Sequence, residues 1–344
     1  MRHEENRLEK VETENKSLIA TLDYSELIDR FLRGQDVKPK SKETYRRALK
    51  QFFEYISRRG ITQPTHEDIL TYKDDLQTGK YKPTGWELSA YTVSSYIISL
   101  RKFFKWTEEE RIYPNIAHDI KGQKKPKGFN KDALSLEQAQ KLLSDIENET
   151  LQGARDYAIV NLLIRTGLRT IEVARANIGD IRQQSGQPVL KIQGKGRDSK
   201  DEIVVLTDET LKPIKAYIAM RGEGKGDNSP LFISHSNRDY GRRLTTRSIS
   251  RIVKDRLIAS GIDDKKITAH SLRHTAVTLS LIGGATIQEA QSLARHSNIN
   301  TTLIYAHNLD RIAKAPEKKI DALLGVIKNN VYNVNTKIQE AEVL

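Results

Sequence analysis

Residues 293–307 read LARHSNINTTLIYAH and hold the most informative pattern of the chain. The residues up to Ala294 predict the end of a helix that begins at 287, and Asn300, a good helix N-cap, predicts the start of a short second one. His296 and Tyr305 flank this start, nine positions apart. A tyrosine in such an apolar segment is ordinarily a core residue, so a functional interpretation of Tyr305 needs support from other segments.

Two further segments carry residues suited to binding a phosphate. His270 and Arg273 are three positions apart, which places them on one face of a helix predicted for 271–282. Arg169 follows Gly167, the predicted end of a buried helix over 154–165, and begins the next helix, where backbone N–H groups favour an anion. Each pattern alone is typical of a solvated surface.

These residue types suit the cleavage of a phosphodiester without a metal ion. Arginine gives bidentate contacts and stays charged, so it can stabilise the negative charge on the phosphoryl oxygens. Lysine or histidine can protonate the leaving oxygen. A tyrosine can attack the phosphorus and form an ester that preserves the bond energy for rejoining. Its ordinary pKa is about 10, so nearby cations must help the phenolate to form.

A predicted β-hairpin lies between Arg169 and the histidines. Residues 189–192 and 203–206 resemble two short strands around the sequence Gly-Lys-Gly-Arg at 194–197. Lys195 would then lie in the turn, from which a lysine can reach into a groove. The ordinary interpretation of such a segment is a flexible, solvated turn.

The chain before residue 120 is predicted to be a small helical bundle. Aromatic and aliphatic residues recur at helical spacing over residues 20–118, with basic residues on the opposite faces. A cationic linker over 121–131 follows, with five lysines and no acidic residue. The candidate contacts to a phosphate backbone are Lys42, Arg46, Arg47, Lys50, Arg101, Lys102, Lys124, Lys125 and Lys127. After the linker, Ser135 and Gln138 form a predicted capping box.

Composition limits the classes of partner and compartment. Lysine and arginine number 57 against 45 acidic residues, a net charge of +12 that favours a polyanion as partner. No cysteine is present, which excludes disulfides and thiol nucleophiles and suits the cytoplasm. No stretch approaches the ~20 apolar residues of a membrane span. The N-terminus is too polar for a signal peptide, and residues 4–18 are predicted to form a polar helix.

The order of the motifs is more specific than any one of them. Gly-Leu-Arg, a Gly-Lys-Gly hairpin, His-x-x-Arg, and a histidine nine residues before a tyrosine follow one another, as in tyrosine recombinases. The chain resembles that family, which includes phage integrases, Xer-type resolvases and integrases of mobile elements, over residues ~20–328. The resemblance implies a mainly α fold, a two-domain DNA clamp whose catalytic domain holds a small β-hairpin or sheet.

The expected domains follow from the same resemblance. Residues 1–20 are expected to form a polar helix and 21–120 a SAM-like, helical core-binding domain. A basic linker at 121–133 leads to the catalytic domain at 134–328, and 329–344 is expected to be a tail.

The resemblance also implies roles for the site residues. Arg169 and Arg273 match the two arginines that hold the scissile phosphate, and His296 matches the position that donates to a phosphoryl oxygen. Tyr305 matches the nucleophile, which forms a 3′-phosphotyrosyl link.

The remaining catalytic positions concern proton transfer and orientation. Lys195 resembles the hairpin lysine that protonates the 5′-oxygen leaving group, with Lys200 as an alternative. His270 is similar to the histidine that assists proton transfer, and Glu172 is expected to orient the site. Neither a metal nor a cofactor is implied.

The implied function is site-specific recombination of double-stranded DNA by a homotetramer bound to two recombination sites. Accessory DNA-bending or partner proteins are possible further partners. The reaction is integration or excision of a mobile element, or resolution of DNA multimers, in the cytoplasm at the nucleoid of a bacterial, archaeal or phage-type cell. The helix predicted at 316–327 is a candidate for exchange between protomers. One alternative is a type IB topoisomerase-like enzyme, which shares the chemistry. The other is a non-catalytic DNA-binding accessory protein, and an SDS-resistant protein–DNA adduct would exclude it.

Overall fold

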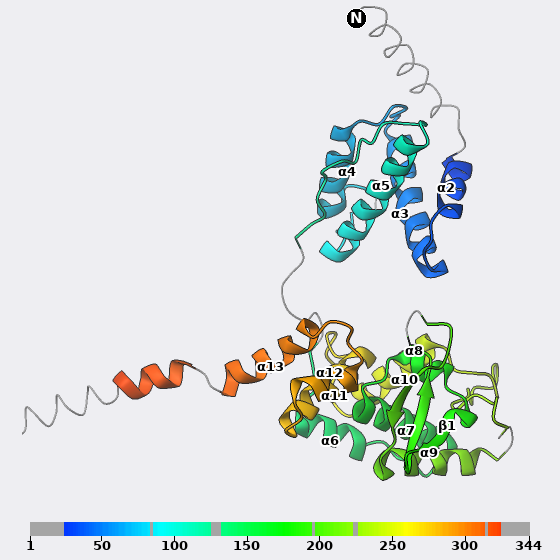
Figure 1. The fold of residues 1–344 in the computed structure, drawn as a ribbon, viewed down its shortest axis with the longest axis vertical. Helices are drawn as coiled ribbons and strands as arrows, with labels where there is room; N and C mark the ends of the chain where they lie inside the picture. The colour runs from blue at the N-terminus through cyan, green and yellow to red at the C-terminus, as the bar shows by residue number, and fades with distance from the viewer. Residues whose placement is uncertain are drawn as a thin grey trace, which may run out of the picture. The chain divides into compact units, whose positions relative to one another are not determined.

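The computed structural model describes residues 24–82, 85–124, 132–194, 197–222, 226–313 and 316–324. The segments predicted as a polar helix at 4–18 and a tail at 329–344 lie outside these ranges. The chain divides near residue 127 into two compact units (Figure 1). Within the described residues helices predominate and the only sheet is small, so the predicted mainly α fold is confirmed.

The first unit is a helical bundle with an aromatic core. Its described helices are α2 (Tyr24–Arg33), α3 (Pro39–Arg58), α4 (His66–Thr78) and α5 (Ala90–Glu109). Phe31, Phe52 and Phe103 are fully buried. The rings of Phe31 and Phe103 meet edge to face, with centroids 5.4 Å apart, a geometry worth ~0.5–1.5 kcal/mol beyond area burial. The apolar stripes of the sequence therefore form this core.

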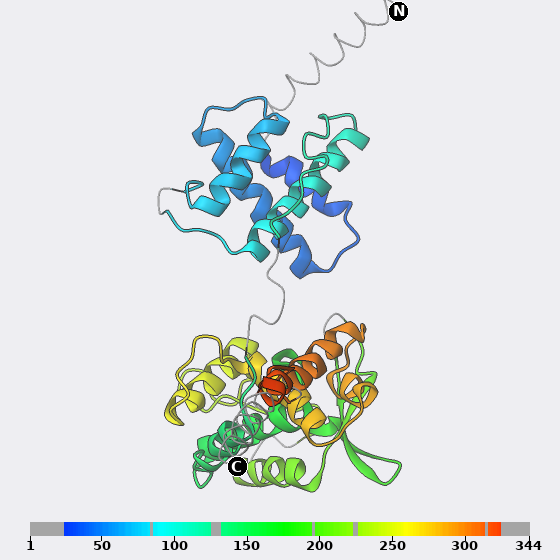
Figure 2. The ribbon, with the colours of Figure 1, turned by 90° about the vertical axis from the view of Figure 1, so that its left-hand side faces the viewer.

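The second unit combines helices with a sheet of three strands at its edge (Figure 2). Its described elements are α6 (Leu136–Ser144), α7 (Leu151–Thr166), α8 (Thr170–Arg175), η1 (Ile178–Asp180), β1 (Ile181–Gln184), β2 (Gln187–Ile192), β3 (Glu202–Val205), α9 (Asp208–Arg221), α10 (Thr246–Ala259), α11 (Ala269–Ile282), α12 (Ile287–Ala294) and α13 (Asn300–Ala313), and residues 316–324 are also helical.

The sheet is antiparallel in the order β1-β2-β3. The strands β2 and β3 correspond to the predicted hairpin. The strand β1 reads IRQQ and lacks apolar alternation, so only its pairing with β2 identifies it as a strand.

Helix α7 is the centre of the second unit. Twelve of its 16 residues are buried, as its nearly continuous apolar sequence predicts, and it packs against α6, α9, α10 and α11. It ends at Gly167, whose φ of +61° lies in the left-handed region that favours glycine. The turn at Gly167 leads directly to Arg169, the N-cap residue of α8, and so places this arginine beside the core.

Capping residues fix the other helix starts near the site. The predicted capping box of Ser135 with Gln138 is present, and Thr286 forms another with Glu289. At α13 the prediction was inexact, because Asn300 is the first helical residue and its backbone N–H donates to the side-chain oxygen of Asn298, 2.9 Å away. Helix α13 also has 14 residues instead of being short, since Thr301, Thr302 and the residues after them continue the helix.

Across the residues that the structure describes, no helix is both long enough and apolar enough to cross a bilayer.

Substituting Gly153, in the first turn of α7, tests how closely this helix is packed. Glycine-to-alanine changes in helices usually stabilise by ~0.5–1 kcal/mol. A Cβ at residue 153 would lie 2.1 Å from the carbonyl oxygen of Glu147, so we expect Gly153→Ala to destabilise the second unit by ~1–3 kcal/mol. Gly226→Ala, whose Cβ would meet Ser229 Oγ at 3.7 Å, is the matched control and should change stability by less than ~0.5 kcal/mol.

Urea unfolding measures both variants. The two tryptophans, Trp86 and Trp106, belong to the first unit, so circular dichroism changes without a fluorescence change report the second unit. An unchanged or higher midpoint for Gly153→Ala would contradict the packing described for α7.

Candidate active site

A buried carboxylate gathers arginines from separate segments of the second unit. Glu172, on α8, is 0% exposed. Its Oε2 accepts from the backbone N–H of Arg169 at 2.8 Å, and its Oε1 accepts from Arg169 Nη1 at 2.8 Å. Oε2 also accepts from Nη2 of Arg295 at 2.9 Å. These three contacts hold two guanidinium groups on one carboxylate.

Arg273, on α11, is the most deeply buried of the arginines in this cluster, at 2% exposed. Its guanidinium donates to the carbonyl oxygens of Gly167 and Ala294. Burial and, to a smaller extent, the positive charges of Arg169 and Arg295 lower its pKa to about 10. The turn after α7 and the end of α12 therefore both hold Arg273, and its charge is only partly compensated.

Arg295 is a member of the cluster that the sequence motifs do not indicate. It has a φ of +52°, a conformation in which non-glycine residues are uncommon. Its side chain is 9% exposed, and Nη1 donates to the carbonyl oxygen of Leu293 at 2.9 Å. Glycine is the usual residue at such a backbone position after a helix. An arginine directly after the predicted end of a helix at Ala294 was therefore the one sequence signal that Arg295 has a special role.

Tyr305 lies against two imidazole rings. It is 5% exposed, in a small cluster with Val277, Ala290 and Ala294. Its hydroxyl is hydrogen-bonded to Nδ1 of His274.

The ring of His296 stacks on that of Tyr305 at an interplanar angle of 19°, with centroids 6.4 Å apart. Nδ1 of His296 is hydrogen-bonded to Oγ1 of Thr302 at 3.0 Å. The structure thus brings His296 and Tyr305 together.

Burial sets the ionisation of these groups. It raises the pKa of Tyr305 to about 12, while the charge of Arg273 acts in the opposite direction. Burial also lowers the pKa of His274 and of His296 to about 4, assisted by neighbouring positive charges. At neutral pH the phenol is therefore protonated and both imidazoles are neutral.

His270 lies at the rim of this group. Its side chain is exposed, and its ring meets that of His274 edge to face, with centroids 4.7 Å apart. His270 and Arg273 come from the first turns of α11, as the His-x-x-Arg spacing predicts.

The hairpin lysine is the predicted catalytic residue that the structure does not place. Lys195 lies outside the described residues. The alternative, Lys200, forms an ion pair with Asp180. Arg197 binds Asp201 and Glu202, with N–O distances of 2.7 and 3.0 Å.

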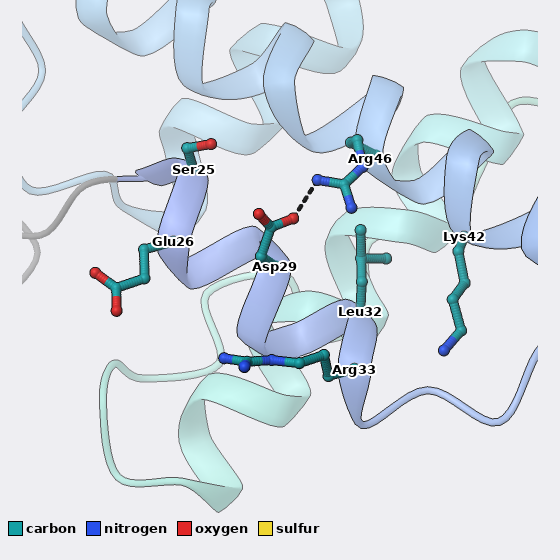
Figure 3. A pocket seen from close by; sticks show the side chains of 7 residues that line it. All are labelled: Ser25, Glu26, Asp29, Leu32, Arg33, Lys42 and Arg46. Carbon is teal, nitrogen blue, oxygen red and sulfur yellow. Dashed lines mark hydrogen bonds and ion pairs between the residues drawn. The ribbon is translucent and has the colours of Figure 1, made fainter.

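The predicted DNA contacts of the first unit lie on its surface, and several have partners. Arg46 forms an ion pair with Asp29 across a shallow groove between α2 and α3, and Lys42 extends away from that pair (Figure 3). The ammonium of Lys102 lies 5.4 Å from the ring centroid of Tyr45.

The other predicted contacts divide between exposed residues and residues outside the structure. Arg47, Lys50, Arg101 and Lys124 are exposed. Lys125 and Lys127 lie outside the described ranges. Within those ranges no group of three or more His, Cys, Asp or Glu side chains is arranged to hold a metal ion.

Family profiles match both units. The profile described as the phage integrase family matches residues 132–311, and that of the phage integrase N-terminal SAM-like domain matches residues 28–111. The chain belongs to the phage integrase family. Within it, the chain is a tyrosine recombinase, an enzyme of the site-specific recombinase class.

Relatives resemble this chain over most of its length. Tyrosine recombinase XerD of Listeria monocytogenes serotype 4b (strain F2365) is 31% identical over 294 residues, which are 82% of this chain and 90% of that protein. Tyrosine recombinase XerC of Pelobacter propionicus (strain DSM 2379 / NBRC 103807 / OttBd1) is 30% identical over 287 residues, 83% of this chain and 90% of that protein.

Solved structures share the fold. XerH site-specific recombinase bound to palindromic difH substrate aligns with a TM-score of 0.65 and 23% identity, covering 86% of this chain and 85% of that one. The Tn1549 transposon integrase in complex with transposon right end DNA has a TM-score of 0.62 and 19% identity, covering 83% of this chain and 94% of that one.

Glu172→Gln tests whether one carboxylate holds the arginine cluster. The amide keeps the shape but removes the fully buried counter-charge of Arg169 and Arg295, so we expect a loss of ~3–5 kcal/mol in the stability of the second unit. Urea unfolding followed by circular dichroism measures it. Glu209→Gln removes an exposed carboxylate, 3.8 Å from Lys212, and should change stability by less than ~0.5 kcal/mol. Equal effects of the two substitutions would refute the structural role of Glu172.

Proposed function

We propose that this enzyme cleaves and rejoins double-stranded DNA through a 3′-phosphotyrosyl link formed by Tyr305. The observation that carries the proposal is the placement of the Tyr305 phenol against His274 and His296, close enough to Arg273 for its charge to lower the phenol pKa. Arg273 in turn lies close to the cluster in which Glu172 binds Arg169 and Arg295.

The scissile phosphate is proposed to bind at the arginines. Arg169 and Arg273 are the proposed phosphate ligands, because their fixed positive charges meet the negative charge that builds on the phosphoryl oxygens as Tyr305 attacks. Arg169 is 28% exposed at its side chain, so it is accessible to a phosphate while Glu172 fixes its direction. His296 is the proposed donor to a phosphoryl oxygen.

Departure of the 5′-oxygen needs a proton. Lys195, which falls in the sequence between β2 and β3 and matches the hairpin lysine of the family, is the proposed acid. The ion pair with Asp180 makes Lys200 a poorer choice, because the partner carboxylate holds its ammonium. The exposed His270 is proposed to assist proton transfer at the rim of the site.

The partner is proposed to be DNA, held by basic side chains of both units. The names of the solved relatives describe a recombinase bound to difH substrate and an integrase in complex with transposon DNA. The exposed Arg47, Lys50 and Arg101 of the first unit are available for phosphates.

Strand exchange between two DNA sites is proposed to need four protomers. Accessory proteins are possible further partners. The helical segment 316–324 has Ile320, Leu323 and Leu324 each more than half exposed, an apolar face suited to a neighbouring protomer. The reaction is proposed to be either multimer resolution or mobile-element integration and excision. The sites that the protein occupies in cells, mapped by sequencing of bound DNA, distinguish the two.

Tyr305→Phe tests the chemistry. The variant keeps the ring in its cluster and loses the nucleophilic oxygen, so it should bind DNA normally and form no SDS-resistant adduct. The assay uses a nicked duplex that carries the sequence the protein selects from random DNA. Tyr240→Phe, at a residue that is 64% exposed, is the control and should form the adduct as the native enzyme does. An adduct with the Tyr305→Phe variant would refute the proposed nucleophile, and none with the native enzyme would favour an accessory protein.

Chelation gives a second test. Because guanidinium groups provide the proposed charge stabilisation, adduct formation by the native enzyme should proceed at the same rate in excess EDTA. A loss of cleavage that added Mg²⁺ restores would contradict this assignment of the charge-stabilising role.

A further inference from the structure

His274 contacts the proposed nucleophile, although the motif assigns roles only to its neighbours His270 and Arg273. It lies on α11 and is 7% exposed, with Nδ1 hydrogen-bonded to the Tyr305 hydroxyl. Its ring centroid is 5.5 Å from that of Tyr305. A polar ring buried beside the reacting oxygen is placed to act on the phenol proton.

The nucleophile cannot attack without losing that proton. Burial raises the pKa of the Tyr305 phenol to about 12, so phenolate is scarce at neutral pH. Burial lowers the pKa of His274 to about 4, with His270, Arg273 and His296 adding to the effect. The resting imidazole is therefore neutral, and in the tautomer protonated at Nε2 it offers a lone pair at Nδ1 to the phenol O–H.

We propose that His274 is a catalytic residue, the general base that takes the phenol proton through Nδ1 as Tyr305 attacks the phosphodiester. This inference rests on the proposed function of Tyr305. It assigns to His274 a step at the nucleophile, separate from the protonation of the leaving group.

The proposed step conserves atoms and charge. The O–H bond of Tyr305 breaks and its proton goes to Nδ1 of His274, while the phenol oxygen forms a bond to phosphorus. The bond from phosphorus to the 5′-oxygen breaks, and that oxygen takes a proton from the acid proposed to be Lys195. In the rejoining step the imidazolium returns its proton to the departing Tyr305 oxygen.

Proton transfer becomes favourable only during the attack. In the resting site His270, Arg273 and His296 oppose a positive charge on His274. A bound phosphate adds negative charge among the same groups, which raises the proton affinity of His274. At the same time the phenol oxygen loses its basicity as it bonds to phosphorus. Transfer concerted with attack therefore suits this pair, and general bases of this kind contribute ~10²–10⁴-fold to rate.

His274→Asn tests the proposal in single-turnover cleavage of the selected nicked duplex. The amide oxygen can occupy the place of Nδ1 and accept the phenol hydrogen bond, but it cannot take the proton. We expect DNA affinity within about twofold of native and a cleavage rate lower by at least ~100-fold.

The matched control is a second histidine–tyrosine pair in the same unit. Nε2 of His235 is hydrogen-bonded to the Tyr217 hydroxyl at 3.1 Å, and burial lowers the pKa of His235 to about 4. His235→Gln should therefore perturb an analogous, partly buried pair and leave the cleavage rate unchanged.

A substrate with sulfur in place of the 5′-bridging oxygen identifies the end of the reaction at which His274 acts. A thiolate leaves without an acid, so the defect of His274→Asn should persist on it. Rescue by sulfur would make His274 the leaving-group acid and overturn the proposal. A cleavage rate of His274→Asn equal to or above that of the native enzyme on the ordinary duplex would also overturn it. The hydrogen bond would then only hold Tyr305 in its resting position. If the native enzyme forms no Tyr305 adduct, the proposed function itself fails.

The native protein provides a readout that needs no variant to fold. Long-range ¹H–¹⁵N correlation spectra distinguish imidazole tautomers, and the His274 signals can be identified by their change in Tyr305→Phe. We expect the Nε2–H tautomer, with Nδ1 as hydrogen-bond acceptor. An Nδ1–H tautomer that persists with the selected duplex bound would contradict the general-base role.

Discussion

The carboxylate of Glu172 is the charge on which this site depends. It is inaccessible to solvent and binds the side chains of Arg169 and Arg295, and Arg273 lies close enough for its pKa to respond to it. Glu172, with Glu202 at 3.8 Å from Nε of Arg295, thus faces three positive charges in a poorly solvated region, where uncompensated charge is costly. An added anion would lower that cost, so the energetics that fold the cluster also prepare it for a phosphate.

The same burial keeps the reactive groups of the site neutral until a substrate binds. Low solvent access raises the pKa of Tyr305 and lowers those of His274 and His296. In such a site the proton and the phosphate must be handled together, since neither phenolate nor imidazolium is stable alone. The small cluster of Val277, Ala290 and Ala294 around Tyr305 supplies the apolar surroundings that this coupling requires.

Local patterns predicted much of this arrangement. Residues a few positions apart determine three of its features: the buried helix α7, the left-handed turn at Gly167 and the start of α13. The local sequence is therefore sufficient to predict them. Arg295 with Glu172 and His274 with Tyr305 are contacts across 123 and 31 positions. Helical periodicity describes one element at a time and cannot indicate such pairs. The order of the motifs indicated the proposed catalytic residues through family resemblance. It did not indicate which residues bind the side chains of Arg295, His274 or Lys200.

Peptide mapping of the protein–DNA adduct tests the central claim most directly. Cleavage by trypsin after Arg295 and Arg311 releases residues 296–311, a peptide with a single tyrosine. The account predicts that mass spectrometry finds the 3′-phosphate of the cleaved strand on Tyr305 in this peptide. A nucleotide attached to any other residue, or joined through its 5′-phosphate, would contradict it.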